Sequence, residues 1–226
     1  MSRQDDTQAL SVNGVRISRR DFLGLVSGTV ALGALGRPGL LLAQGRGLLT
    51  VAAPANPSSL DPATGGAGTD HVFLYPIFDT LVEWDYATLA PKPGLAKAWA
   101  YPDPKTLVLS LQENVRFHDG TPLQAEDVAF SFERLPRVPN SPGSFASAVR
   151  TISGVTIVDD RTLRITTSEP SPYLDAELTA VMILSRRLHA NASTADFNTG
   201  RAMIGTGAYR HVAYVNGERL EAERNL

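Results

Sequence analysis

Polar and apolar residues alternate in the middle of the chain, and this spacing predicts half-buried strands. In KTLVLSLQ every second residue is a leucine (Leu107, Leu109 and Leu111), which places three apolar side chains on one face of a strand. NVRFHDG continues the alternation. We therefore expect these two stretches to pair as a hairpin across Gln112–Asn114.

Helical spacing is clearest just after this alternation, in AEDVAFSFERL. Val128, Phe132 and Leu135 stand four and three residues apart, so they share one face of a helix. Glu126 and Asp127 fall in the first turn, where carboxylates suit the helix dipole. A second helix is predicted in SPYLDAELTAVMI.

Other strands and loops follow from short apolar runs and from turn residues. LLTVAA (Leu48–Ala53) predicts a buried strand, and a loop rich in Pro, Gly, Ser and Thr follows it. DHVFLYPIFDTLVEWD predicts a short helix up to about Tyr75 and then a strand, whereas PKPGLAKAWA predicts an exposed connector. GVTIVDDRTLRITT predicts one hairpin, and Asn216-Gly217 predicts a second. This mixed order favours an α/β or α+β domain.

Composition and charge narrow the class of protein. The chain has 226 residues, 43% of them hydrophobic and 19% charged, which is typical of a folded protein with one large or two small domains. The net charge of -2 argues against nucleic acid as a partner. The absence of cysteine excludes thiolate metal sites, cysteine nucleophiles, disulfides and lipid attachment at a cysteine.

Residues 1–43 have the pattern of an export signal. Basic residues precede a Gly-rich, weakly apolar stretch, and Ala43 is the small residue at its end, although Leu41 stands where a second small residue is usual. Ser18–Leu23 matches the twin-arginine pattern S-R-R-x-F-L, with Arg19 and Arg20 as the pair. We therefore expect export by the twin-arginine (Tat) translocase and a soluble periplasmic protein that begins near residue 44.

The residues that could carry chemistry form no catalytic constellation. His118, Asp119, Glu126 and Asp127 lie within ten positions, but a turn and a helix start account for them, so a scaffold role is favoured over acid–base catalysis. The four histidines form no HxH, HxxH or HExxH spacing, and no G-x-S-x-G is present. The sequence therefore predicts no catalytic residues, no metal and no cofactor.

Several motifs resemble the family 5 extracellular solute-binding proteins, which are the peptide-, oligopeptide- and nickel-binding components of ABC importers. PGLAKAWA matches P-x-L-A-x-x-W, VRFHDGTP matches V-x-F-H-D-G-x-P, and AEDV matches A-x-D-V. SLDPA, DTLVEWD, GVTIVDDRTLRITTSEPSPYL and GTGAYR follow the family order, although Ala208 replaces the customary proline.

This resemblance implies a fold, a function and a site. The fold is periplasmic binding protein-like (type II, cluster C-like): residues 44–226 would form an incomplete α/β lobe I with a mixed sheet, and lobe II would be absent. The implied function is capture of a peptide or related small solute and delivery to an ABC transporter permease. The implied ligand contacts are Ala53, Pro54, Ala55, Asn56, Ser144 and Phe145. A secreted enzyme with an unfamiliar site and a non-functional truncated binding protein remain the alternatives.

Overall fold

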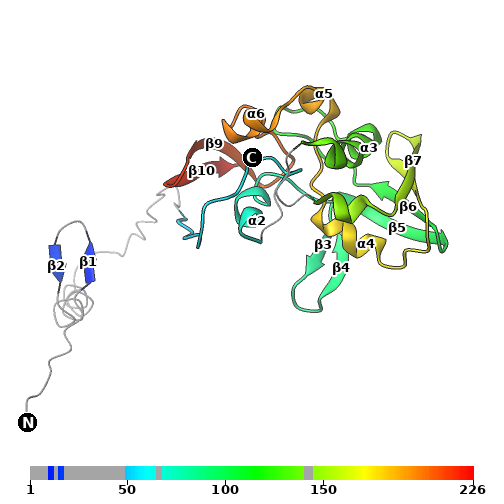
Figure 1. The fold of residues 1–226 in the computed structure, drawn as a ribbon, viewed down its shortest axis with the longest axis horizontal. Coiled ribbons are helices and arrows are strands. Elements are labelled where there is room, and N and C mark those ends of the chain that lie inside the picture. Colours follow the sequence, from blue (N-terminus) through cyan, green and yellow to red (C-terminus); the bar gives the residue numbers. More distant parts are fainter. Residues whose placement is uncertain (1–9, 13–14, 18–48, 65–67, 140–144) are drawn as a thin grey trace, which may run out of the picture. The chain divides into compact units, whose positions relative to one another are not determined.

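The computed structural model describes residues 10–12, 15–17, 49–64, 68–139 and 145–226 (Figure 1). The chain divides into two units, Met1–Thr50 and Val51–Leu226. The first contains a hairpin of β1 (Leu10–Val12) and β2 (Val15–Ile17), which was not predicted. Most of the predicted export signal, residues 1–43, lies outside the described residues, and its role stays a prediction.

The second unit contains a four-stranded antiparallel sheet with the order β5-β6-β8-β7. Its strands are β5 (Ala96–Asp103), β6 (Thr106–Leu111), β7 (Ile152–Asp159) and β8 (Thr162–Thr167). The alternating leucines of β6 are buried, as predicted. The predicted hairpin of β7 and β8 is also confirmed.

The predicted partner of β6 was wrong. β6 pairs with β5 and β8, whereas NVRFHDG forms no strand beyond a single bridge between Arg116 and Pro122. Asn114 has a φ of 61°, a left-handed conformation that interrupts an extended course. The segment expected to be an exposed connector instead supplies β4 (Ala90–Pro93) and the start of β5, because Leu95 and Ala96 are buried in the core.

Helix α3 (Ala125–Arg134) is the predicted amphipathic helix, and it is followed by the 3-10 helix η1 (Leu135–Arg137). Val128, Phe132 and Leu135 belong to the same buried cluster as the leucines of β6 and β8. Burial of a large apolar side chain contributes roughly 1.5–3 kcal/mol, so this face holds α3 on the sheet. Asp127 accepts the N–H of Gln124 at 2.9 Å and thus caps the helix.

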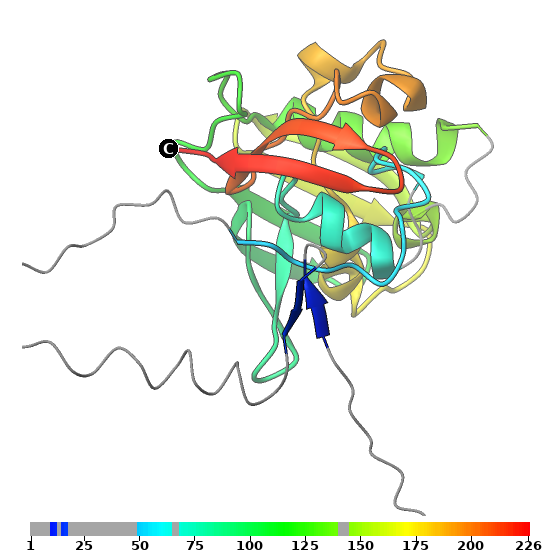
Figure 2. The same cartoon turned by 90° about the vertical axis from the view of Figure 1, so that its left-hand side faces the viewer.

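A second apolar cluster lies beneath the hairpin of β9 (Tyr209–Val215) and β10 (Arg219–Arg224). Its buried members are Leu60, Leu74, Ile77, Phe78, Met182, Leu184, Phe197, Ala202 and Met203. Tyr214 and Leu220, which face each other across the hairpin, pack against it. Figure 2 shows this hairpin in red beside the helices α5 (Arg186–His189) and α6 (Thr194–Asn198). Gly217 has a φ of 79°, which fits the predicted Asn-Gly turn.

The remaining elements contribute buried side chains to one cluster or the other. Helix α2 (Gly68–Leu74) and β3 (Val82–Asp85) lie where the sequence predicts a helix and a strand. The predicted helix in SPYLDAELTAVMI is limited to the short α4 (Leu174–Glu177) and η3 (Leu178–Ala180). The short helix η2 (Phe145–Val149) completes the helices of the described residues.

The predicted buried strand at Leu48–Ala53 was wrong. Residues 49–53 form no strand, and Leu49 and Val51 are 79% and 66% exposed. No other described strand pairs with this segment, so its apolar character does not produce burial. The observed architecture is nevertheless the mixed α/β arrangement with antiparallel sheets that the sequence predicts. Within the described ranges, no helix has the length and apolar character needed to cross a membrane.

Candidate functional site

The predicted ligand contacts Ala53, Pro54, Ala55 and Asn56 lie on an irregular segment at the start of the second unit. Ala53 is half-buried and the other three are exposed. Among the described residues, the backbone groups of this segment have no hydrogen-bond partner. Asn56 lies beside the β9–β10 turn, because a Cβ added to Gly217 would be 3.7 Å from its Nδ2. The segment therefore presents free N–H and C=O groups, which an extended ligand could pair with.

Immediately after this segment the chain is fixed by a carboxylate of α2. The backbone N–H of Ser58 donates to Oδ1 of Asp70 at 2.7 Å, and the Ser58 hydroxyl donates to Oδ2 at 2.8 Å. Asp70 is fully buried. Hydrogen bonds to a charged acceptor contribute about 1.5–3 kcal/mol each, so Ser58 is firmly held.

A second anchor comes from α6. The side-chain carbonyl of Asn198 accepts the hydroxyl of Ser59 at 3.0 Å and the backbone N–H of Leu60 at 2.8 Å. Ser59 in turn accepts the N–H of Asp61 at 3.0 Å. Helix α6 thus determines where the chain turns inward.

The third anchor is a buried ion pair between Asp61 and Arg134, the last residue of α3. The two Nη atoms of Arg134 donate to the two carboxylate oxygens of Asp61 at 2.7 and 2.8 Å. Asp61 is fully buried and Arg134 is 9% exposed. Thr194 donates to Asp61 Oδ2 at 2.8 Å, and the Ala63 N–H donates to Oδ1 at 2.9 Å. All of these donors stabilise the ionised carboxylate.

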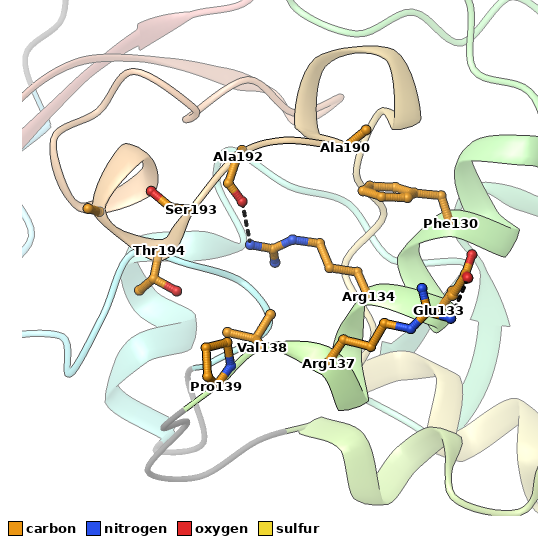
Figure 3. Close-up of a pocket in the computed structure, with 11 residues that line it drawn as sticks. Phe130, Glu133, Arg134, Arg137, Val138, Pro139, Ala190, Ala192, Ser193 and Thr194 are labelled. Carbon is orange, nitrogen blue, oxygen red and sulfur yellow. Dashed lines mark hydrogen bonds and ion pairs between the residues drawn. The ribbon is translucent and has the colours of Figure 1, made fainter.

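Arg134 has further contacts that fix its own position. One Nη donates to the carbonyl of Ala192 at 3.4 Å, as Figure 3 shows. The guanidinium carbon lies 4.9 Å from the ring centroid of Phe197, within the range of a cation–π contact. The opening segment of the unit, α3 and α6 therefore meet at this one side chain.

A cavity of about 490 Å³ lies beside Arg134 (Figure 3). Its lining residues are Phe130, Glu133, Arg134, Arg137, Val138, Pro139, Ala190, Ala192, Ser193, Thr194 and Ala195. Arg137 and Glu133 form an exposed ion pair at 2.6 Å. Arg134 therefore forms part of the cavity wall.

The other two predicted contacts are not brought to this segment by any observation. Ser144 lies outside the described residues, and Phe145 begins η2. A ligand-binding role for all six predicted residues stays a prediction. SLDPA is recognisable as a motif in the sequence. The partners of its aspartate, Arg134 and Thr194, are not, because no local spacing connects residues so far apart in the chain.

The titratable residues near His118 in the sequence make hydrogen bonds and ion pairs that hold the fold together. His118 Nδ1 accepts the N–H of Gly205 at 3.2 Å, and Nε2 lies 2.9 Å from the carbonyl of Gly207. Burial lowers the pKa of His118. Asp127 accepts the backbone N–H of Arg186 at 2.8 Å, and Asp119 pairs with Arg187. These contacts support the scaffold interpretation.

The glycines of the GTG turn are required by close packing. A Cβ on Gly205 would lie 1.9 Å from the carbonyl oxygen of Ile77, and one on Gly207 would lie 2.6 Å from that of Pro76. Between them Thr206 donates to Asp79 at 2.9 Å, and burial raises the pKa of this carboxyl. The described part of the chain contains no group of three or more His, Cys, Asp or Glu residues that could hold a metal ion.

Comparison with known proteins identifies the family. Residues 90–226 match the profile of the bacterial extracellular solute-binding proteins, family 5 Middle. The periplasmic oligopeptide-binding protein OppA of Salmonella typhimurium is 33% identical over 153 residues, which are 60% of this chain and 28% of that protein. The probable D,D-dipeptide-binding periplasmic protein DdpA of Escherichia coli is 33% identical over 133 residues, or 56% of this chain and 25% of that protein.

Solved structures show the same relationship. NikZ from Campylobacter jejuni, in complex with Ni(L-His), superposes with a TM-score of 0.65 at 29% identity. The match covers 74% of this chain and 33% of the NikZ chain. OppA from Haemophilus influenzae, in complex with RPPGFSPFR, has a TM-score of 0.67 at 25% identity. The match covers 76% of this chain and 37% of the OppA chain. The chain thus spans between 25% and 37% of the length of these relatives. Its fold is periplasmic binding protein-like, and the chain belongs to family 5 of the bacterial extracellular solute-binding proteins.

Proposed function

We propose that this chain supplies one wall of the ligand site of an exported protein that captures peptides and delivers them to the permease of an ABC importer. The observation that carries the proposal is the segment Ala53–Asn56, which is mostly exposed and offers backbone groups that have no partner among the described residues, directly before three anchors, of which the Asp61–Arg134 pair is buried. Peptides in an extended conformation are recognised through such main-chain groups. A rigid segment binds with a smaller loss of conformational entropy than a mobile one.

The relatives support a peptide as the ligand class. Two of them are named for binding oligopeptides and D,D-dipeptides, and one structure contains the peptide RPPGFSPFR. We further propose that residues 1–43 direct export through the Tat translocase and that residues 44–226 act as lobe I, which would close on the ligand against a second lobe. Ser144 and Phe145 would belong to the same wall.

The test is peptide binding by the full-length protein as its gene encodes it. Isothermal titration with a set of tri- to pentapeptides is expected to give saturable binding, with the peptide recovered intact by mass spectrometry. Free amino acids and nickel with histidine serve as competing ligand classes. Absence of binding by every peptide, with a folded protein confirmed by circular dichroism, would contradict the proposal. Cleavage of the peptide would favour the secreted-enzyme alternative.

A pair of variants tests the segment itself. Ala55→Pro removes one exposed N–H that has no partner among the described residues, whereas Ala55→Ser keeps it. We expect Ala55→Pro to weaken peptide binding and Ala55→Ser to leave it unchanged, with equal thermal stability for the two variants. Equal affinities would show that the segment's backbone at Ala55 does not contact the ligand.

A further inference from the structure

We propose that Arg134 is a positioning residue for the segment Ala53–Asn56, and that the cavity beside it lets a small cation from solvent take its place. The inference rests on the proposed function, because its main readout is peptide affinity. Arg134 does not lie on the segment. It acts through Asp61, which follows the segment by a few residues and is held end-on by both Nη atoms at 2.7 and 2.8 Å.

Arg134 supports two of the three anchors of the segment. It pairs directly with Asp61, and its contacts with Ala192 and Phe197 also fix the chain that leads into α6. Helix α6 carries Asn198, which holds Ser59 and Leu60. Loss of Arg134 therefore weakens the second and third anchors together, and the contact of Ser58 with Asp70 is left to hold the segment alone.

Burial makes this contact sensitive to the charge of Arg134. Asp61 is fully buried, and a buried carboxylate without its partner is strongly destabilised. After removal of the guanidinium, Asp61 can regain stability by moving toward water. The cavity, which Thr194 also lines, offers space for that movement. Such a movement would pull the chain at Ser59 and Leu60 and displace the segment before it.

The cavity makes a chemical rescue possible. It measures about 490 Å³ and has Arg134 in its wall, so a shorter side chain joins it to the carboxylate of Asp61. A free guanidinium ion has the planar donor geometry that a carboxylate accepts in pairs. It should enter the vacated site, neutralise Asp61 and restore the path of the segment. Sodium ions carry the charge without this geometry.

The experiment compares Arg134→Ala with the wild type in the full-length protein. We expect Arg134→Ala to weaken peptide binding about three- to thirtyfold, the range of couplings through packed networks. About 20 mM guanidinium chloride, far below denaturing concentrations because unfolding free energy falls by only a few kcal/mol per molar, should restore at least half of the lost affinity. The same concentration of sodium chloride should not, and neither salt should change the wild type.

Two variants serve as controls for the geometry. Arg137→Ala removes an arginine that also lines the cavity but pairs with exposed Glu133, and it should leave affinity unchanged with or without guanidinium. Arg134→Ala combined with Asp61→Asn removes the charge that guanidinium would pair with, so no rescue is expected. Wild-type affinity in Arg134→Ala, or a loss that guanidinium does not repair, would overturn the inference.

A readout without ligand separates this inference from the proposed function. The amides of Leu60 and Ala63 donate to Asn198 and Asp61, so their hydrogen exchange should accelerate in Arg134→Ala and slow again with guanidinium. If the wild type binds no peptide, the proposed function fails while this exchange still tests the anchor. Should Arg134→Ala not fold, Arg134→Lys provides the comparison: faster exchange at Ala63 is expected, and unchanged exchange would overturn the inference.

Discussion

His118 and Gly205 form a reciprocal pair of hydrogen bonds. The backbone N–H of His118 donates to the carbonyl of Gly205 at 2.8 Å, and the N–H of Gly205 donates to Nδ1 of the imidazole at 3.2 Å. Nδ1 must therefore be unprotonated, so Nε2 carries the proton and donates it to the carbonyl of Gly207 at 2.9 Å. The FHDG motif thus holds the GTG turn in place, and it needs a neutral imidazole to do so.

The first prediction concerns the dependence of stability on pH. Burial lowers the pKa of His118 from its ordinary value of 6.5, so the unfolded chain binds a proton more readily than the folded chain. The free energy of unfolding should be constant above pH 6.5 with respect to this group and should fall as the pH drops below that value. Urea titrations between pH 7.5 and 5 measure it.

His118→Gln supplies the comparison for this prediction. Glutamine offers a neutral amide N–H for the carbonyl of Gly207 but does not titrate. The variant should be less stable at pH 7.5, and its stability should decline less steeply toward pH 5. Burial also lowers the pKa of His71, His189 and His211, so part of the decline remains. If the free energy of unfolding of His118→Gln declined with pH as steeply as that of the wild type, His118 would not be the source of the decline.

The sequence predicted the elements whose pattern is local. The leucines of β6 and the apolar face of α3 were found because one residue type recurs at a fixed spacing. Two of the errors have a common cause: strand pairing depends on residues distant in the chain. β6 pairs with β5 and β8 instead of NVRFHDG, and residues 49–53 have no strand beside them.

In the candidate site, too, contacts between residues distant in the chain could not be predicted from the sequence. The motif resemblance implies Ala53–Asn56 as ligand contacts, but the anchors that fix this segment come from side chains far along the chain. Asp61 and Arg134 are separated by 73 positions, and Ser59 and Asn198 by 139. Neither pair leaves a periodic signal in a single sequence. Only the folded chain shows that the SLDPA motif is a buried anchor.

The second prediction tests the close approach at the GTG turn. Gly205→Ala would place a methyl group 1.9 Å from the carbonyl oxygen of Ile77, so the backbone must move. We expect a loss of at least about 3 kcal/mol in the free energy of unfolding, the upper range for overpacked sites. Gly154→Ala is the control, because its methyl group would meet only the side-chain hydroxyl of Thr166, at 2.9 Å. Gly154→Ala should lower the free energy of unfolding much less than Gly205→Ala does. Similar losses in the two variants would contradict the packing argument.

The third prediction concerns a strained residue in the β3–β4 turn. Leu89 has a φ of 55°, a left-handed conformation that is unfavourable for a leucine, and it is 73% exposed. Leu89→Asn should raise the free energy of unfolding by about 0.5–1 kcal/mol, because asparagine tolerates this conformation and little burial is lost. The midpoint of urea unfolding measures the gain. Tyr86→Asn, at a comparably exposed position with no positive φ, should give no such gain.

The fourth prediction concerns the contact of Tyr101 with Asp175, which connects β5 to α4. The Tyr101 hydroxyl donates to Oδ1 of Asp175 at 3.1 Å and accepts its backbone N–H at 3.0 Å. Partial burial, together with the negative charge of Asp175, raises the pKa of Tyr101 to about 12. Asp175→Asn removes the charge and should bring this pKa closer to 10, the ordinary tyrosine value.

Titration of the tyrosine side chains by NMR measures this shift, with Tyr101 assigned through the Tyr101→Phe variant. The raised pKa of Tyr101 also determines how stability changes with pH. Because the folded state favours the protonated phenol, the free energy of unfolding should fall as the pH rises above 10. Asp175→Asn should reduce this alkaline loss, although it also weakens the hydrogen bond that Trp99 Nε1 donates to Oδ2 of Asp175 at 3.2 Å. A Tyr101 pKa that stays near 12 in Asp175→Asn would mean that burial alone sets it, and the connection between β5 and α4 would then rest on packing instead of charge.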